Sequence, residues 1–241
     1  MNTTYSDKIS IGSRRLYAEW SGAGAPVIVL DSGGTGAGCW HGAWGPIWNE
    51  LAALSLVCRY DRANTGRSDP APAPRTGQDM LADLRLMLSA AGFPPPYLLV
   101  GHSFGGLVMQ LFARRHPDEV AGLVLIDSVH PDQVERFYAL SQSAGDNELA
   151  EIKEALVGID WHASVAQVRQ APALAEMPLV VITRGRPTPA GEVWNELQAS
   201  LAAQLPSSRH IIAHHSGHAI QFDEPQVVIA AIESLLPHAR V

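Results

Sequence analysis

A serine at position 103 stands where a side chain can act as a nucleophile. It is the centre of a G-x-S-x-G pattern formed by residues 101–105. An apolar run over residues 97–100 predicts a buried strand before it, and the residues after it predict a helix. The flanking glycines permit a tight, strained turn that pushes the serine hydroxyl outward at the helix N-terminus. In this context a nucleophile is favoured over a serine that only caps a helix.

A serine hydroxyl is a weak nucleophile near neutral pH, so it needs a base, and histidine has the most suitable pKa for that task. The chain has ten histidines. His102, which precedes the serine, is predicted to face away from it and to be packed or hydrogen-bonded as a structural residue. His214 and His215 are predicted to be polar loop residues rather than metal ligands, because no cluster of carboxylates or cysteines accompanies them.

The elements that must position these groups are visible in the hydrophobic pattern. Apolar runs without alternation are typical of strands buried on both faces, and they occur at residues 26–30, 54–58, 97–100, 123–126, 179–182 and 211–213. Stretches with helical spacing lie between them, at residues 42–54, 78–91, 105–115, 193–205 and 225–236. Residues 8–20 alternate around Gly12 and Ser13, which predicts a hairpin. The pattern predicts an α/β fold, with an eight-stranded, mostly parallel sheet and helices on both faces.

One segment interrupts this alternation. Residues 131–176 contain no buried strand and show the spacing of two or three amphipathic helices. An insertion of this size on the side where the strands' carboxyl ends emerge would form a cap. We therefore expect residues 1–130 and 177–241 to form the core and residues 131–176 to form a small helical cap.

The serine motif, in its strand–turn–helix context, resembles the nucleophile turn of the α/β-hydrolases. The stretch from Tyr60 to Asp69 is similar to a loop of the same family, and the resemblance covers nearly all of the chain. It implies a serine hydrolase in which Ser103 is the nucleophile. The family's general base lies in a Gly-His loop after the last strand, which corresponds to His218. For Asp61 and Arg62 the interpretation we favour is a salt-bridge role near the site rather than catalysis.

The family's catalytic acid often follows the seventh strand, but residues 179–189 contain no carboxylate. Glu192 and Glu196 come next, and their spacing of four on a predicted helix suits surface pairing with a cation. Asp127 ends the sixth predicted strand, and some family members carry their acid at that position. The resemblance therefore implies that Asp127 is the acid. The alternative is an aspartate that caps the following turn.

An acyl-transfer site also needs two donors for the oxyanion, which are usually backbone amides. The first is expected to be the N–H of Phe104, directly after the nucleophile. Similarity of residues 32–36 to the family's glycine loop implies that Gly34 supplies the second, although Gly33 stays an alternative.

A ligand pocket needs an apolar wall, and among the tryptophans we place Trp40 near the substrate. Trp44 and Trp48 are as well explained as core residues. Arg184 and Arg186 follow the seventh predicted strand. They suit either an anionic group of a ligand or salt bridges to Glu192 or Glu196.

Composition narrows the possible partners. The chain has 17 basic and 24 acidic residues, a formal net charge of −7, which disfavours binding to nucleic acid or to an anionic membrane. Gly34 and Gly36 do not continue into a dinucleotide motif, and no phosphate-binding G-x-x-x-x-G-K-[ST] occurs, so no cofactor is expected. Two cysteines are too few for a disulfide framework or a four-ligand zinc site. The N-terminus lacks an apolar signal region, and we expect a soluble, cytoplasmic protein.

These observations lead to one expected function. We expect a cofactor-independent serine hydrolase that cleaves small to medium carboxylic esters through an acyl-enzyme, with a small ester-like molecule as its partner. The same residues could act on a thioester, lactone, amide or carbon–carbon bond. A ligand receptor on this fold that has lost turnover is the alternative from another class. The sequence leaves the oligomeric state open.

Overall fold

Eight strands form one sheet in the computed structural model, which describes residues 2–34, 36–39, 42–138, 158–188 and 190–236. The strands are β1 (Thr4–Ser10), β2 (Arg15–Ser21), β3 (Val27–Asp31), β4 (Val57–Tyr60), β5 (Tyr97–His102), β6 (Val120–Ile126), β7 (Leu179–Arg184) and β8 (Arg209–Ala213). Their order across the sheet is β1-β2-β4-β3-β5-β6-β7-β8. Pairs β1–β2 and β2–β4 are antiparallel and the other neighbours are parallel. The predicted eight-stranded, mostly parallel sheet is confirmed.

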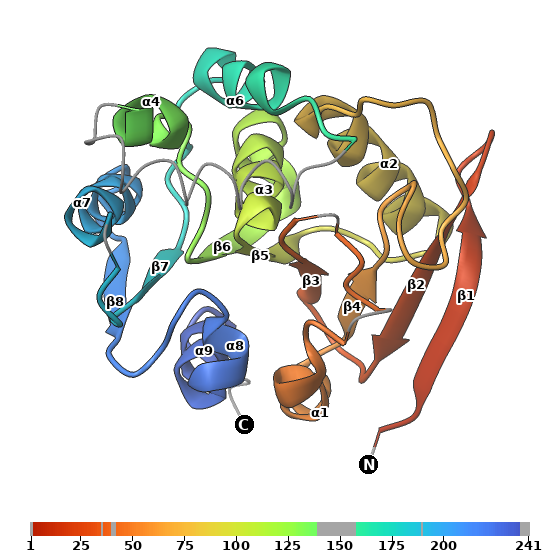
Figure 1. Ribbon diagram of the computed structural model, residues 1–241. Coiled ribbons are helices and arrows are strands. Elements are labelled where there is room, and N and C mark those ends of the chain that lie inside the picture. The colour runs from red at the N-terminus through yellow and green to blue at the C-terminus, as the bar shows by residue number, and fades with distance from the viewer. Residues whose placement is uncertain (1, 35, 40–41, 139–157, 189, 237–241) are drawn as a thin grey trace.

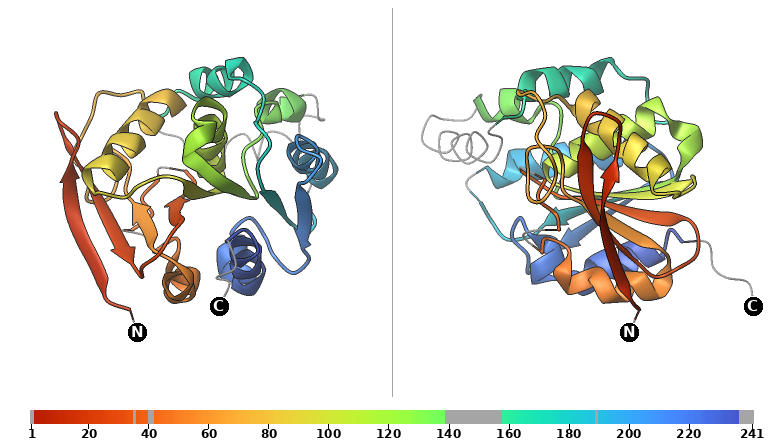
Figure 2. Two further views of the ribbon diagram at one scale, coloured as in Figure 1. Left: turned by 180° about the vertical axis from the view of Figure 1, so that it is seen from behind. Right: turned by 90° about the vertical axis from the view of Figure 1, so that its right-hand side faces the viewer.

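Helices cover both faces of this sheet (Figure 1). The main helices are α1 (Gly45–Leu54), α2 (Gly77–Ala90), α3 (Phe104–Arg115), α4 (Gln133–Tyr138), α6 (Trp161–Gln170), α7 (Gly191–Ala202) and α9 (Pro225–Glu233). Two short helices, η1 (Pro117–Glu119) and α8 (Ile220–Asp223), were not predicted. Helices α1, α8 and α9 lie on one side of the sheet, and α2, α3 and α6 lie on the other (Figures 1 and 2).

The two layers explain why the central strands read as unbroken apolar runs. The prediction of burial on both faces is wrong for β8, an edge strand in which residues 209–212 are exposed or half-buried. Val27 and Val29 of β3 pack into the core shared with α2 and α3. Ile28 and Leu30, which alternate with them, pack into the core shared with α1 and α9. All four side chains are buried. Because both faces are covered, neither face of the strand needs polar residues.

Capping residues, glycine and proline set the helix ends, which the hydrophobic spacing predicts only approximately. The Thr76 hydroxyl accepts a hydrogen bond from the Asp79 amide, and the Asp79 carboxylate accepts one from the Thr76 amide at 2.9 Å, so a capping box starts α2. Gly92, with φ of +72°, follows its end. Helix α1 begins at Gly45 rather than at the expected residue 42, and Pro46 occupies its first turn, where the missing amide hydrogen costs nothing.

The segment expected to form a cap contributes α4 and α6. Helix α6 packs against α2 and α3. The Asp160 carboxylate accepts a hydrogen bond from the Ala163 amide at its start, and the Ser164 hydroxyl accepts one from the Gly77 amide of α2 at 2.9 Å. Residues 139–157 lie outside the described residues, so the division into core and cap stays a prediction. Within the described ranges, no helix combines the length and the apolar character needed to cross a membrane.

Candidate active site

Ser103 occupies a strained turn between β5 and α3. Its φ of 53° and ψ of −123° lie in a region that non-glycine residues rarely adopt. Strain of this kind costs about 1–3 kcal/mol and persists only where the surroundings enforce it. The Ser103 carbonyl accepts hydrogen bonds from the Gly106 and Val129 amides, both at 3.0 Å. A Cβ on Gly105 would lie 2.2 Å from the Asp31 carbonyl oxygen, so only glycine fits there. Backbone hydrogen bonds and the close packing of Gly105 thus fix the turn.

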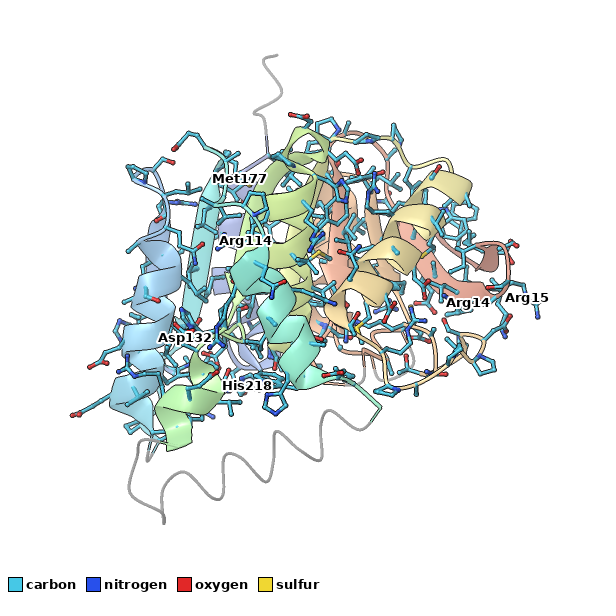
Figure 3. All side chains as sticks on the ribbon, turned by 90° about the horizontal axis from the view of Figure 1, so that it is seen from above. Arg14, Arg15, Arg114, Asp132, Met177 and His218 are labelled. Atoms are coloured by element: carbon cyan, nitrogen blue, oxygen red, sulfur yellow. The ribbon has the colours of Figure 1, made fainter. Side chains whose placement is uncertain are left out.

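A hydrogen bond joins the other two predicted catalytic residues. The Oδ2 atom of Asp127 lies 2.6 Å from Nδ1 of His218. Asp127 follows β6, has a φ of 40° and is fully buried, whereas 44% of the His218 side chain is exposed. Figure 3 places His218 on the opposite side of the molecule from Met177, which precedes β7. Ser103, Asp127 and His218 therefore all lie at the carboxyl edge of the sheet, as the strand–helix alternation predicts.

Asp127 has other hydrogen-bond and ion-pair partners besides His218. Its Oδ1 atom accepts hydrogen bonds from the Trp194 indole at 2.7 Å and from the Arg184 amide at 3.1 Å. The Arg184 guanidinium lies 3.6 Å from Oδ2. Burial by itself raises the pKa of Asp127, but the hydrogen bond and charge of His218, together with Arg184, outweigh it and hold the pKa below its ordinary value. The carboxylate is therefore ionised and can stabilise a positive charge on His218.

The glycine loop after β3 lies against the serine. A Cβ built on Gly33 would lie 2.7 Å from the Cβ of Ser103. Phe104 is the first residue of α3, so its amide has no partner within the helix. Arg62 holds the loop through hydrogen bonds to the Asp31 carboxylate at 2.7 Å, to the carbonyl of residue 32 at 2.8 Å and to the Gly34 carbonyl at 3.1 Å.

The contacts of Arg62 agree with the salt-bridge role expected of it, and Asp61 binds backbone amides. Arg62 and Asp31 form a buried ion pair. The Asp61 carboxylate accepts hydrogen bonds from the amides of Cys39 at 2.8 Å and Arg67 at 3.1 Å. Both residues therefore organise backbone near the site.

Comparison with known proteins shows the family of this chain. A family model described as "alpha/beta hydrolase fold" matches residues 26–179, more than half of the 241 residues. The chain belongs to the α/β-hydrolase family. It is 29% identical over 216 residues to the uncharacterized protein YqjL of Bacillus subtilis, which covers 88% of this chain and 83% of that protein.

Two further matches carry hydrolase names. A pimeloyl-[acyl-carrier protein] methyl ester esterase of Chromobacterium violaceum is 39% identical over 112 residues, 46% of this chain and 40% of that protein. A hydrolase from Pseudomonas aeruginosa has a similar structure, with a TM-score of 0.68, 22% identity, and coverage of 97% of this chain and 98% of that one. Several curated relatives are matched over less than half of their own length.

The sequence did not predict that Arg184 and Trp194 contact the Asp127 carboxylate of this α/β-hydrolase. Arg184 was expected to meet an anionic group of a ligand or to pair with Glu192 or Glu196. In the structure its guanidinium lies 3.6 Å from the Asp127 carboxylate and stacks 4.6 Å over the Trp194 ring. Glu196 pairs instead with Arg136, and the other cation of that stretch, Arg186, pairs with Asp223. The sequence shows Trp194 only as an apolar position on a helix, because Asp127, the partner of its indole N–H, lies 67 positions away in the chain.

The remaining predicted residues are three tryptophans and two histidines. Trp44 and Trp48 are 0% and 6% exposed, so the core interpretation is correct for both. Trp40, which was placed near the substrate, lies outside the described residues. His214 and His215 are exposed, and among the described residues no group of three or more His, Cys, Asp and Glu side chains could hold a metal ion.

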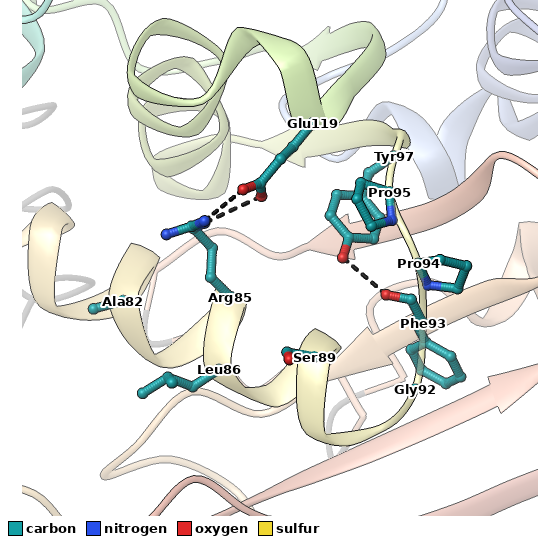
Figure 4. A pocket seen from close by; sticks show the side chains of 10 residues that line it. All are labelled: Ala82, Arg85, Leu86, Ser89, Gly92, Phe93, Pro94, Pro95, Tyr97 and Glu119. Atoms are coloured by element: carbon teal, nitrogen blue, oxygen red, sulfur yellow. Dashed lines mark hydrogen bonds and ion pairs between the residues drawn. The ribbon is translucent and has the colours of Figure 1, made fainter.

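A hollow of about 760 Å³, shown in Figure 4, lies away from the carboxyl edge of the sheet. It is formed by α2 and by the loop that leads into β5, at the opposite end of that strand from Ser103. Three of its polar side chains have partners, since Arg85 pairs with Glu119 and the Tyr97 hydroxyl donates to the Phe93 carbonyl at 2.9 Å. This hollow contributes no group to the chemistry described above.

Proposed function

We propose that this α/β-hydrolase is a serine hydrolase that cleaves small to medium carboxylic esters through an acyl-enzyme. The observation that carries the proposal is the 2.6 Å hydrogen bond between buried Asp127 and His218, at the same sheet edge as the strained Ser103. A buried, ionised acid fixes the imidazole so that its other nitrogen can accept a proton. That arrangement serves nucleophilic catalysis better than ligand binding alone.

Each residue has a defined part in the proposed reaction. The Ser103 hydroxyl attacks the ester carbonyl, and Nε2 of His218 takes its proton. The tetrahedral oxyanion accepts hydrogen bonds from the amides of Phe104 and Gly34. His218 then gives the proton to the departing alkoxide, which leaves as the alcohol and forms the Ser103 ester. Water, activated by the same imidazole, releases the carboxylic acid and restores the serine.

The contacts of the glycine loop support this assignment of donors. Gly33 lies against Ser103 with no room for a side chain, so the next amide along the loop, that of Gly34, is close to the serine. The Gly33 carbonyl, which shares a peptide plane with the Gly34 amide, accepts a hydrogen bond from the Gly36 amide at 3.0 Å, and this leaves that plane little freedom. A donor that is fixed before the substrate arrives needs no reorganisation during the reaction, and one such donor contributes about 10²- to 10³-fold in kcat.

Carboxylic esters are the proposed substrates because the donors and the base suit an acyl carbon with an alkoxide leaving group. The esterase name of the Chromobacterium violaceum relative supports the same class. Thioesters, lactones, amides and carbon–carbon bonds are alternatives on the same residues, and a receptor without turnover is the alternative outside enzymes. A small molecule is the proposed partner in each case.

Two measurements test the proposal. A fluorophosphonate probe should add one label to the wild-type chain and none to Ser103→Ala, as measured by intact mass. A panel of p-nitrophenyl esters from acetate to octanoate, with a lactone, a thioester and an anilide, should give the highest kcat/KM on an ester. A folded wild-type protein that takes no label and turns over no member of the panel would favour the receptor alternative.

A further inference from the structure

His102 connects the strand that carries the nucleophile to the loop that carries the base. It is the last residue of β5 and directly precedes Ser103. Its Nε2 atom lies 2.9 Å from the backbone carbonyl oxygen of His218. Because a carbonyl oxygen can only accept, Nε2 must carry the hydrogen, and this fixes the tautomer of His102. One hydrogen bond thus links the neighbour of one catalytic residue to the backbone of another.

The same imidazole also borders the loop proposed to hold the oxyanion. A Cβ on Gly33 would lie 3.1 Å from Nδ1 of His102. The ring centroids of His102 and His218 are 4.7 Å apart. The His102 side chain is therefore packed between the glycine loop and the His218 loop, directly behind the serine turn.

The other contacts of the His218 loop come from different elements. The Asp223 carboxylate of α8 accepts a hydrogen bond from the Gly217 amide at 2.7 Å, and the Arg186 amide donates to the Ser216 carbonyl at 3.0 Å. Asp127 holds the imidazole ring from the end of β6. In the described part of the chain, the bond from His102 is the hydrogen bond that ties this loop to β5, and hence to Ser103.

We propose that His102 is a positioning residue, which fixes the separation of Ser103 and His218 by donating from Nε2 to the His218 carbonyl. This inference rests on the proposed function. Without the bond, the loop is still held toward Asp127 but is free to shift relative to the serine. A displacement of about 1 Å between reacting groups can cost about 10²-fold in rate.

A neutral donor suits this position better than a charged one. His218 gains a positive charge when it takes the serine proton, and a cation at the position of the His102 ring would oppose that step. Burial, with repulsion from the charged form of His218, lowers the pKa of His102 to about 3. His102 therefore stays neutral while its neighbour changes charge.

Two substitutions of matched length separate the donor from the packing. His102→Gln keeps an N–H donor at a similar reach, whereas His102→Met has the same chain length and no donor. We expect His102→Met to lower kcat by about 10- to 100-fold with KM within about twofold of wild type. His102→Gln should stay within about fivefold of the wild-type kcat. Equal losses in the two variants, or an undiminished kcat in His102→Met, would overturn the proposal.

Three controls make each result decisive. His210→Met removes another ring hydrogen bond, 2.7 Å to the Thr183 hydroxyl on β7, and should leave kcat unchanged. Circular dichroism and thermal unfolding report whether each variant is folded. If His102→Met does not fold, His102→Phe keeps a ring without the donor and should show the same loss of kcat. A wild-type protein that resists the fluorophosphonate probe contradicts the proposed function itself, whereas a labelled, active wild type with a fully active His102→Met contradicts only the role of His102.

Discussion

Two loops beside Ser103 are held in different ways. The glycine loop after β3 is fixed by Arg62 and Asp31, which are 3% and 1% exposed and form a buried ion pair. The His218 loop is fixed by separate hydrogen bonds to Asp127, His102, Asp223 and Glu224, and its last two partners lie nearer the surface. The first loop is built as part of the core. The second is attached to it at several points.

Because the two loops are held differently, substitutions in them should affect stability and activity to different degrees. Removing one partner of a buried ion pair leaves the other charge buried and alone, which destabilises the whole fold. Removing one of several hydrogen bonds to a loop near the surface leaves the fold intact and changes where the loop lies. Damage to the glycine loop should therefore appear first in unfolding, and damage to the His218 loop first in kcat.

The largest effect is expected from Asp127→Asn, which replaces the acid by a neutral group. It should lower kcat by about 10⁴-fold with little change in KM, because the imidazole loses both its preferred tautomer and the charge that stabilises its protonated form. Ester hydrolysis and circular dichroism measure the two sides of this prediction. Glu192→Gln, assayed in parallel, should retain activity, and a folded, fully active Asp127→Asn would overturn the assignment of the acid.

The same carboxylate should make stability depend on pH. The folded-state pKa of Asp127 is held below its ordinary value, so its contribution to stability is fully present above the unfolded pKa of about 3.9 and is lost as the pH falls through the lower, folded value. The difference in unfolding free energy between wild type and Asp127→Asn should therefore shrink in acid. Urea unfolding at neutral pH and below pH 4 tests this, and a difference that grows in acid would contradict the sign.

Breaking the buried pair tests the other half of the comparison. Arg62→Met should reduce the free energy of unfolding by about 3–5 kcal/mol, because Asp31 is left buried without its cation. The exposed pair between Arg186 and Asp223 provides the matched control, and Arg186→Met should cost less than about 1 kcal/mol. Thermal and urea unfolding compare the two. Similar losses in both variants would remove the distinction between the loops.

A smaller effect is expected when the acid loses one of its donors. Trp194→Phe keeps an aromatic ring but removes the 2.7 Å hydrogen bond to Asp127. Hydrogen bonds to a charged group contribute about 1.5–3 kcal/mol, so kcat should fall by roughly tenfold or somewhat more. The steady-state kcat and KM measure this. A variant with unchanged kcat would mean that Arg184 and His218 alone suffice to orient the carboxylate.

The smallest effect is expected at the outer side of the His218 loop. Glu224 accepts hydrogen bonds from the His215 amide and the Ser216 hydroxyl, both at 2.8 Å. Glu224→Ala should lower kcat by about two- to fivefold and leave the melting temperature nearly unchanged, because contacts near the surface contribute little to stability. Glu224→Gln, which keeps an acceptor, serves as the control. A large fall in melting temperature would show that this loop, too, is part of the core.

Local patterns in the sequence determined the frame of this protein. Apolar runs of four or five residues predict the central strands, because apolar side chains on both faces of a strand favour burial on both faces. The glycines around Ser103 predict a tight turn, because larger side chains would collide there. Hydrophobic patterns do not predict short elements such as α8, because its four residues are too few to show a helical periodicity.

Only the tertiary structure decided which groups meet. The contacts of Asp127 with Arg184 depend on the parallel register that sets Ile126 beside Ile182, and its contact with Trp194 depends on where α7 packs. The bond from His102 to the His218 carbonyl joins residues 116 positions apart. No local pattern encodes such pairs, because each requires two separate elements to be placed in space before the hydrogen bond can exist.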